Sequence, residues 1–287
     1  MLNKKENKIL NWKKFKEIYK EILQIYPFLN SLEKKAFEKK SEKIINNKSF
    51  FINDPIKTLK RLMKNLNNPH ANVIEGSFKK KSPKKYFEYS IDNNILYLKI
   101  PSWTTTKLDD GLKFAKDLIK LCEKEIKRYK GIIIDVRNNQ GGNSRIAHDF
   151  SGIFFNKDVT FGYLAGKQGN KIKKRPYVLE KNKKIYIDIP IVILINNLCF
   201  SSNELFIAPF KISKRAASIG ERTRGGSANP ISINVEFDNK NYNARIPRWR
   251  FYLKGRKRPI EKTKIEPDII YQKKDIIEFS KKFLLKK

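Results

Sequence analysis

Apolar residues recur three or four positions apart in the first part of the chain, which is the spacing of one face of an α-helix. The pattern predicts helices at residues 9–23, 32–45 and 55–66. Asp54 precedes Pro55, a pair typical of a helix start, with the aspartate as N-cap and the proline at the first helical position. We therefore expect a helical N-terminal domain over residues 1–88.

Farther along, the helical period is replaced by a period of two or by short apolar runs. Such runs are typical of buried strands and occur at residues 95–100, 131–136 and 191–195. Helical patterns separate or follow them, at residues 108–129 and 144–155 and directly after Ser201. Strands that alternate with helices predict an α/β fold, with a parallel or mixed sheet and crossover helices.

The predicted α/β core occupies residues 89–287. Late in the chain, residues 231–235 and 242–246 form a hairpin pattern, and residues 275–284 a closing helix. A chain of 287 residues with 40% hydrophobic and 12% aromatic residues can bury a substantial core, in one large domain or two small ones. This composition excludes a disordered protein.

The formal net charge is +34, which by itself suggests a nucleic acid or another anionic partner. The lysines are spread from end to end, and the one dense cluster lies at residues 79–87. A cluster of this kind is typical of a solvated connector, although it also suits contacts with phosphates. We expect non-specific adhesion to anionic polymers, without recognition of a nucleic-acid sequence.

Cys122 and Cys199 are the only cysteines and lie in apolar segments, which predicts reduced core thiols. With two histidines and no metal-binding spacing, we expect neither a metal nor another cofactor. The first residues lack the apolar core of a signal peptide, and no run of 18 apolar residues occurs. The expected location is therefore cytoplasmic, without a membrane span, unless a leader has been removed.

Ser201 lies where the apolar run 191–195 has ended and a helical pattern begins. A serine at a strand-to-helix turn is exposed beside bare backbone N–H groups, as a nucleophile requires. Ser201 and Glu204 also have the spacing of a capping box, in which the hydroxyl only satisfies a backbone donor. This segment by itself favours the cap.

A second strand, 131–136, runs into the pair Gly141-Gly142. Paired glycines let the backbone approach a ligand closely and direct N–H groups at it. An ordinary turn explains the pair equally well. Functional sites in sheets of this type lie at the carboxyl ends of strands, where both this pair and Ser201 are expected.

Together these segments resemble the tail-specific, or C-terminal processing, serine peptidases and their relatives, the tricorn core protease and the interphotoreceptor retinoid-binding protein repeats. Five motifs match in the family's order and span nearly the whole chain, at residues 68–71, 135–142, 199–204, 220–226 and 261–268. The resemblance implies a crotonase/ClpP-like core, with Ser201 as the nucleophile.

The resemblance also indicates which branch of the family is closest. In the processing branch the general base is a lysine at the position of Gly226, and a PDZ domain follows the histidine motif. Here that position is glycine, and the 24 residues between His70 and Ile95 leave no room for a PDZ domain. The chain therefore looks like the tricorn and retinoid-binding branch, in which a histidine is the base. We expect no lysine to act as the base, and that includes Lys211 and Lys214.

By this resemblance His70 removes the proton of Ser201 and returns it to the leaving group. Glu261 matches the carboxylate that orients the histidine. The N–H groups of Gly141 and Ser202 are implied as the oxyanion hole. Without the resemblance, His70 would be a loop histidine after the third helix and Glu261 a surface residue in a basic hairpin. His148, among apolar neighbours, is interpreted as structural.

Two positions depart from the family pattern. Pro69 stands where tricorn has a serine that relays the carboxylate, and Asn68 where the family has an aspartate. Both changes weaken the contacts that hold the imidazole in one tautomer. We predict a serine peptidase that cleaves a peptide or protein substrate through an acyl-enzyme on Ser201. The alternatives are a non-catalytic ligand- or peptide-binding protein on the same fold and a basic, anion-binding or nucleic-acid-associated protein. The sequence specifies no oligomeric state.

Overall fold

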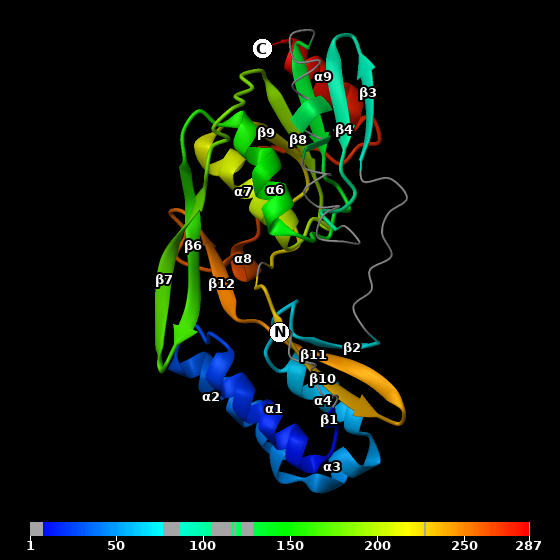
Figure 1. Ribbon diagram of the computed structural model, residues 1–287, viewed down its shortest axis with the longest axis vertical. Coiled ribbons are helices and arrows are strands. Elements are labelled where there is room, and N and C mark those ends of the chain that lie inside the picture. The colour runs from blue at the N-terminus through cyan, green and yellow to red at the C-terminus, as the bar shows by residue number, and fades with distance from the viewer. Residues whose placement is uncertain are drawn as a thin grey trace. The chain divides into compact units, whose positions relative to one another are not determined.

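The computed structural model describes residues 8–76, 87–104, 116–117, 119–121, 129–226 and 228–286 (Figure 1). The chain divides into two compact units. The first, called here the helical unit, comprises Met1–Lys79, Leu164–Lys174 and Ala228–Arg250. The second, called the sheet unit, comprises Lys80–Tyr163, Arg175–Ser227 and Phe251–Lys287.

The helical unit contains the three helices that the sequence predicted, namely α1 (Trp12–Ile25), α2 (Ser31–Asn46) and α4 (Pro55–Lys64). A further short helix, α3 (Lys48–Asn53), was not predicted. The predicted cap of α4 is confirmed, because the Asp54 carboxylate accepts the N–H of Lys57 at 2.8 Å and Pro55 follows it. The first helix begins later than its apolar pattern, since Asn11 caps α1 and Lys8–Ile9 form a short strand, β1.

A four-stranded sheet completes the helical unit. Its order is β1, β10 (Ile231–Phe237), β11 (Lys240–Ile246) and β2 (Asn72–Glu75). The predicted hairpin is confirmed as β10 and β11, which are joined by a turn with positive φ at Asp238 and Asn239. Val235 and Ala244 pack in one core with the helices, so this hairpin shares a unit with the beginning of the chain. The domain boundary that the sequence predicted, at residue 88, instead placed this hairpin in the second domain.

A six-stranded mixed sheet forms the centre of the sheet unit. Its order is β13 (Ile269–Ile270), β9 (Ala217–Gly220), β8 (Ile191–Ile195), β5 (Gly131–Asp135), β4 (Ile95–Lys99) and β3 (Glu88–Asp92). All pairs are parallel except β3 with β4. The runs predicted as buried strands are thus β4, β5 and β8. Every residue of β5 and β8 is buried, as expected for parallel strands covered on both faces.

Helices occur in the sheet unit at the predicted places, as α6 (Ser144–Ser151), which continues into a 3₁₀ turn at Gly152–Phe154, α7 (Ser202–Ser213) and α9 (Ile276–Leu285). The short helix α8 (Ile260–Thr263) was not predicted. Ile276 and Leu284 of α9 pack against Ile133 and Val192 of the sheet. Helices α6 and α7 lie side by side (Figure 1), with the rings of Phe150 and Phe206 stacked 6.2 Å apart.

A third sheet was not predicted. It consists of β12 (Trp249–Leu253), β6 (Val159–Gln168) and β7 (Lys171–Leu179), in that order. Much of β7 is exposed and rich in lysine, so its pattern lacks the alternation of a half-buried strand. Position 162 of β6 must be glycine for steric reasons, because a Cβ there would lie 2.3 Å from the Phe251 ring.

Some expectations concern residues that the structure does not describe. The helix predicted at 108–129 lies mostly outside the described residues, although residues 116–117 and 119–121 are helical. Cys122 and all but the last residue of the lysine cluster at 79–87 also lie outside them. Among the residues that are described, none belongs to a helix both long and apolar enough to span a membrane.

Candidate functional site

Ser201 lies at the turn between β8 and α7, as predicted, and is the N-cap of α7. Its backbone angles are φ 60° and ψ −126°, a region that side-chain-bearing residues rarely occupy. Such a conformation costs about 1–3 kcal/mol and persists only where the surrounding structure enforces it. Serine nucleophiles at sharp strand-to-helix turns have strained geometry of this kind.

Glu204 ties this turn to the loop after β9. Its buried carboxylate accepts the N–H groups of Ser201 at 3.2 Å, Gly225 at 2.9 Å and Gly226 at 2.7 Å, and also the hydroxyl of Thr223. Burial raises its pKa to about 8, and the four donors oppose that rise. The contact with the Ser201 N–H is the glutamate half of a capping box. The glutamate of the predicted capping box thus stabilises the Ser201 turn and connects it to residues 223–226.

The double glycine makes the close approach that its sequence suggested. Gly141 has φ +91°, and a Cβ there would lie 2.9 Å from Ser201 Cβ, 2.9 Å from the Ser202 nitrogen and 2.8 Å from the Phe200 carbonyl oxygen. No side chain fits in this space, so at Gly141 the loop after β5 contacts the Ser201 turn through its backbone. The Gly141 N–H itself donates to Asn139 Oδ1 at 2.8 Å.

Two buried amides that the sequence analysis missed hold the glycine loop and α7 together. Asn203 donates to the carbonyl oxygens of Val136 at 3.0 Å and Asn139 at 3.1 Å, and accepts the Trp103 indole N–H at 3.1 Å. Asn139 in turn donates to the carbonyl oxygen of Ile100 at 3.0 Å. Both amides are fully buried. Their positions, beside the glycine pair and the candidate nucleophile, are the only sequence signal that could have revealed them.

His70 belongs to the helical unit, between α4 and β2. It is only 3% exposed, and its backbone N–H donates to Asn68 Oδ1 at 3.0 Å. This contact needs an oxygen acceptor two residues earlier, which asparagine provides as well as aspartate does. The departure from the family at Asn68 therefore preserves the turn that presents His70. Ser201 and Glu261 belong to the other unit.

Glu261 lies in the first turn of α8, and both of its carboxylate oxygens are buried. The alternative of a surface residue in a basic hairpin therefore does not hold. A Cβ on Gly225 would lie 2.7 Å from the Ile260 carbonyl oxygen and 3.5 Å from Glu261 Cα. The loop that Glu204 binds thus contacts the backbone of Glu261 on one side and the Ser201 turn on the other.

The lysines considered as bases lie at the far end of α7. Lys211 is nine residues beyond Ser202 (211 minus 202), about 14 Å along the helix, and is paired with Asp268. Lys214 is the C-cap of the same helix. Alanine at either position should therefore change the rate at which an active-serine probe labels Ser201 by less than about twofold. A loss of several orders of magnitude in that labelling assay would identify a lysine base.

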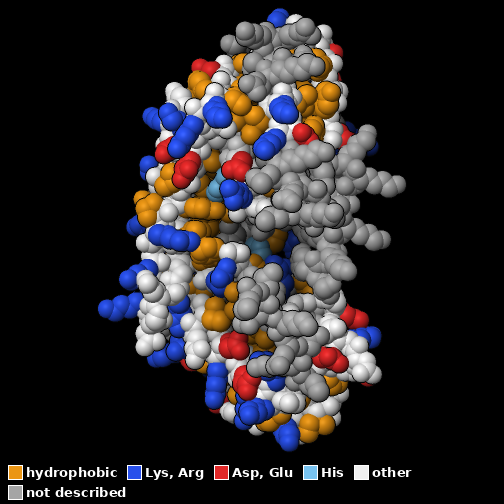
Figure 2. All heavy atoms as spheres, in the orientation of Figure 1, with side chains coloured by type: hydrophobic (Ala, Val, Ile, Leu, Met, Phe, Trp, Pro, Cys, Tyr) orange, Lys and Arg blue, Asp and Glu red, His pale blue; other side chains and the backbone are white. Residues whose placement is uncertain are grey.

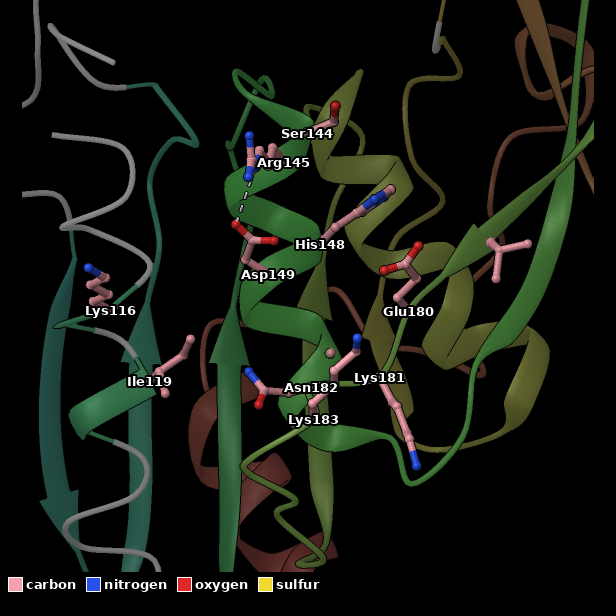
Figure 3. Close-up of a pocket in the computed structure, with 12 residues that line it drawn as sticks. Lys116, Ile119, Ser144, Arg145, His148, Asp149, Glu180, Lys181, Asn182 and Lys183 are labelled. Carbon is pink, nitrogen blue, oxygen red and sulfur yellow. Dashed lines mark ion pairs between the residues drawn. The ribbon is translucent and has the colours of Figure 1, made fainter. Parts of the chain in front are cut away.

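His148 lies on α6 and lines a pocket of about 600 Å³ (Figure 3). Its ring packs edge-on against Phe161 at 5.8 Å and beside Tyr177 at 5.2 Å. Around the pocket, Arg145 pairs with Asp149, and none of the candidate catalytic residues lines it. Burial lowers the pKa of His148 to about 4. The packing supports the structural interpretation.

This pKa predicts a loss of stability in acid. The unfolded chain takes up a proton on His148 near pH 6.5, whereas the folded chain resists until about pH 4. The free energy of unfolding is therefore unaffected by protonation of His148 above pH 6.5. It decreases as the pH falls from 6.5 to 4, by about 3 kcal/mol at most. Urea unfolding at several pH values should show a smaller decrease for His148→Phe than for the unmodified protein. Equal decreases would contradict the assignment.

Cys199 is a buried free thiol, in agreement with the prediction for this residue. It donates to the Val136 carbonyl oxygen at 3.1 Å, and burial raises its pKa to about 12. A thiol with this pKa is not a nucleophile at neutral pH. Although Cys199 lies two residues before Ser201, it therefore serves packing.

The family model described as Peptidase family S41 matches residues 94–271. Over 217 residues the chain is 30% identical to carboxy-terminal processing protease CtpA of Bacillus subtilis (strain 168). That match covers 71% of this chain and 44% of CtpA, so the chain spans less than half the length of this relative.

Two solved structures match nearly all of the chain. One, from Parabacteroides merdae ATCC 43184, is named as a candidate peptidase and has a TM-score of 0.72 at 19% identity. The other, a lipoprotein from Streptococcus agalactiae, has a TM-score of 0.70 at 20% identity. In both comparisons 96% of each chain is covered. At these identities the matches show a shared mixed α/β fold.

Proposed function

We propose that this chain, which belongs to peptidase family S41, is a serine peptidase that hydrolyses peptide bonds of a peptide or protein substrate. The observation that carries the proposal is the strained turn at Ser201, with Gly141 directly against it. A turn that costs free energy and excludes side chains from one flank is expected where backbone donors must surround a reacting carbonyl.

In the proposed reaction, His70 accepts the hydroxyl proton while Ser201 Oγ bonds to the substrate's carbonyl carbon. The carbonyl electron pair moves onto oxygen, where N–H groups of Ser202 and the glycine loop stabilise it. The C–N bond then breaks, and His70 gives its proton to the amine. Water repeats the sequence on the acyl-enzyme. Glu261 is proposed to orient the imidazole.

The histidine branch is supported by the loop at residues 223–226. The processing relatives described above have a lysine base at the position of Gly226. Here the Gly226 N–H donates to Glu204, so this position helps to hold the nucleophile turn and brings no side chain to it. We propose that the core has the crotonase/ClpP-like arrangement of that branch.

A non-catalytic binding protein on the same fold is the second candidate. It is favoured by Pro69, which cannot relay a carboxylate to His70 because it has neither a hydroxyl nor an N–H group. Labelling of Ser201 by an organophosphorus probe separates the two functions. The folded peptidase reacts with the probe, and a binding protein does not.

The charge suggests an additional property. On the face shown in Figure 2, outside the grey atoms, lysine and arginine side chains lie among acidic and hydrophobic ones and form no single block. We propose adhesion to anionic polymers that depends on charge alone. Retention on heparin should fall steeply as salt rises. A complex that survives high salt and discriminates between nucleic-acid sequences would contradict this proposal.

We also propose that the protein is located in the cytoplasm, which cell fractionation tests.

A further inference from the structure

The backbone around Gly142 is held by a single parallel bridge to Trp103. The Trp103 N–H donates to the Gly141 carbonyl oxygen at 3.1 Å, and the Asn143 N–H donates to the Trp103 carbonyl oxygen at 2.9 Å. In this pattern the residue between the two bonded peptides directs its own N–H and C=O away from its partner. The N–H of Gly142 therefore points away from Trp103.

The peptide groups of Gly142 that point away from Trp103 face helix α7. The hydroxyl of Ser202 donates to the Gly142 carbonyl oxygen at 2.7 Å. The preceding residue, Gly141, lies directly against Ser201 and Ser202. Because the bridge to Trp103 uses only the Gly141 carbonyl and the Asn143 N–H, both the N–H and the C=O of Gly142 are directed away from Trp103. The N–H of Gly142 is thus directed to the first turn of α7, beside the nucleophile.

The N–H of Gly141 has a different direction. It donates to Asn139 Oδ1, and that amide is fully buried and anchored to the Ile100 carbonyl oxygen. By contrast, within the described part of the chain neither the Gly142 N–H nor the Ser202 N–H donates a hydrogen bond. An oxyanion hole needs two such donors that are already in place and converge on one point.

We propose that Gly142, rather than Gly141, supplies the second N–H of the oxyanion hole, together with Ser202. The assignment rests on the proposed peptidase function. Gly141 then provides space, because its missing side chain lets the loop reach the Ser201 turn. Asn139 occupies the Gly141 N–H and so leaves the next N–H to face the substrate.

The position of the Gly142 donor is set by tight packing. A Cβ at this residue would lie 2.4 Å from the Trp103 carbonyl carbon and 2.6 Å from the Thr104 nitrogen, and φ is +145°. Any side chain would push the loop off the bridge. Preorganisation of this kind is what makes a backbone donor effective against the charge of a transition state.

The test replaces single backbone N–H groups by ester oxygens, through incorporation of glycolic acid at position 142 or, as the matched control, at position 141. The readout is the rate at which an organophosphonate probe labels Ser201. We expect the ester at 142 to slow labelling by roughly 10²- to 10³-fold and the ester at 141 by less than about tenfold. Thermal unfolding of both proteins shows whether they remain folded.

A structure of the phosphonate adduct of the unmodified protein provides a second measurement, which does not depend on how the esters fold. We expect the phosphonyl oxygen to accept the N–H groups of Gly142 and Ser202. If it accepts the Gly141 N–H instead, or if only the ester at 141 slows labelling, the assignment is wrong while the peptidase proposal stands. A folded, unmodified protein that is not labelled would overturn both.

Discussion

Replacing His70 with alanine is expected to abolish labelling of Ser201 by an organophosphorus probe, nearly as completely as replacing Ser201 itself. A neutral serine hydroxyl is a weak nucleophile, and the imidazole is the proposed acceptor of its proton. Loss of either member of such a pair typically costs roughly 10⁴- to 10⁶-fold in rate. Mass spectrometry of the labelled peptide identifies the modified serine, because Ser202 lies beside Ser201.

Ser202→Ala is the matched control. It keeps the backbone N–H assigned to the oxyanion hole and loses only the hydroxyl that donates to the Gly142 carbonyl oxygen. One neutral hydrogen bond is worth about 1 kcal/mol, so labelling should fall by less than about tenfold. Glu261→Ala should cost less than His70→Ala, because Pro69 has removed the expected relay to the histidine. If the folded wild-type protein resists the probe, the binding-protein alternative replaces the peptidase.

The second large effect is expected at Glu204. Glu204→Ala leaves four donors without their acceptor, namely the part-buried N–H group of Ser201 and the buried N–H groups of Gly225 and Gly226 and hydroxyl of Thr223. Unsatisfied buried donors cost about 1–3 kcal/mol each, and relaxation recovers part of the sum. We expect the free energy of unfolding to decrease by about 4 kcal/mol, with a drop in Tm of roughly 10 °C.

Labelling should also slow in Glu204→Ala at a temperature where the variant is folded, since the Ser201 turn and the 223–226 loop lose their common anchor. Glu42→Ala is the control, because Glu42 is exposed on helix α2. That substitution should change stability by less than about 0.5 kcal/mol. Equal Tm values for the two variants would show that the buried hydrogen bonds of Glu204 do not support the fold.

Most of the secondary structure follows from local sequence. Helix α4 begins at Pro55 because Asp54 offers an acceptor to an N–H that would otherwise lack one. Strands β5 and β8 were evident because short apolar runs, three consecutive isoleucines in β5 and five apolar residues in β8, belong to the centre of a covered sheet. Strand β7 was not evident, since seven of its nine residues are exposed and no alternation appears. The strand is instead stabilised by its pairing with β6, which its sequence pattern does not reveal.

The sequence by itself determined where the candidate nucleophile and the glycine pair lie in the fold, because short motifs at the ends of strands specify such turns. It identified Ser201 at a strand-to-helix turn and the glycine pair at the end of another strand, and the structure has both features. It also predicted the hairpin of β10 and β11. That the hairpin packs with the N-terminal helices was decided by tertiary structure, since Val235 and Ala244 offer an apolar face with no fixed partner.

Only the tertiary structure decided how the site is held together. The contacts of Glu204 with residues 223–226 and of Asn203 with Val136 and Asn139 join segments about 20 to 67 residues apart. The same is true of the choice between the N–H groups of Gly141 and Gly142, which depends on the bridge to Trp103. A local motif specifies which donors and acceptors are present. Their pairing depends on the register of β5 and β8, which the packing of the whole sheet establishes.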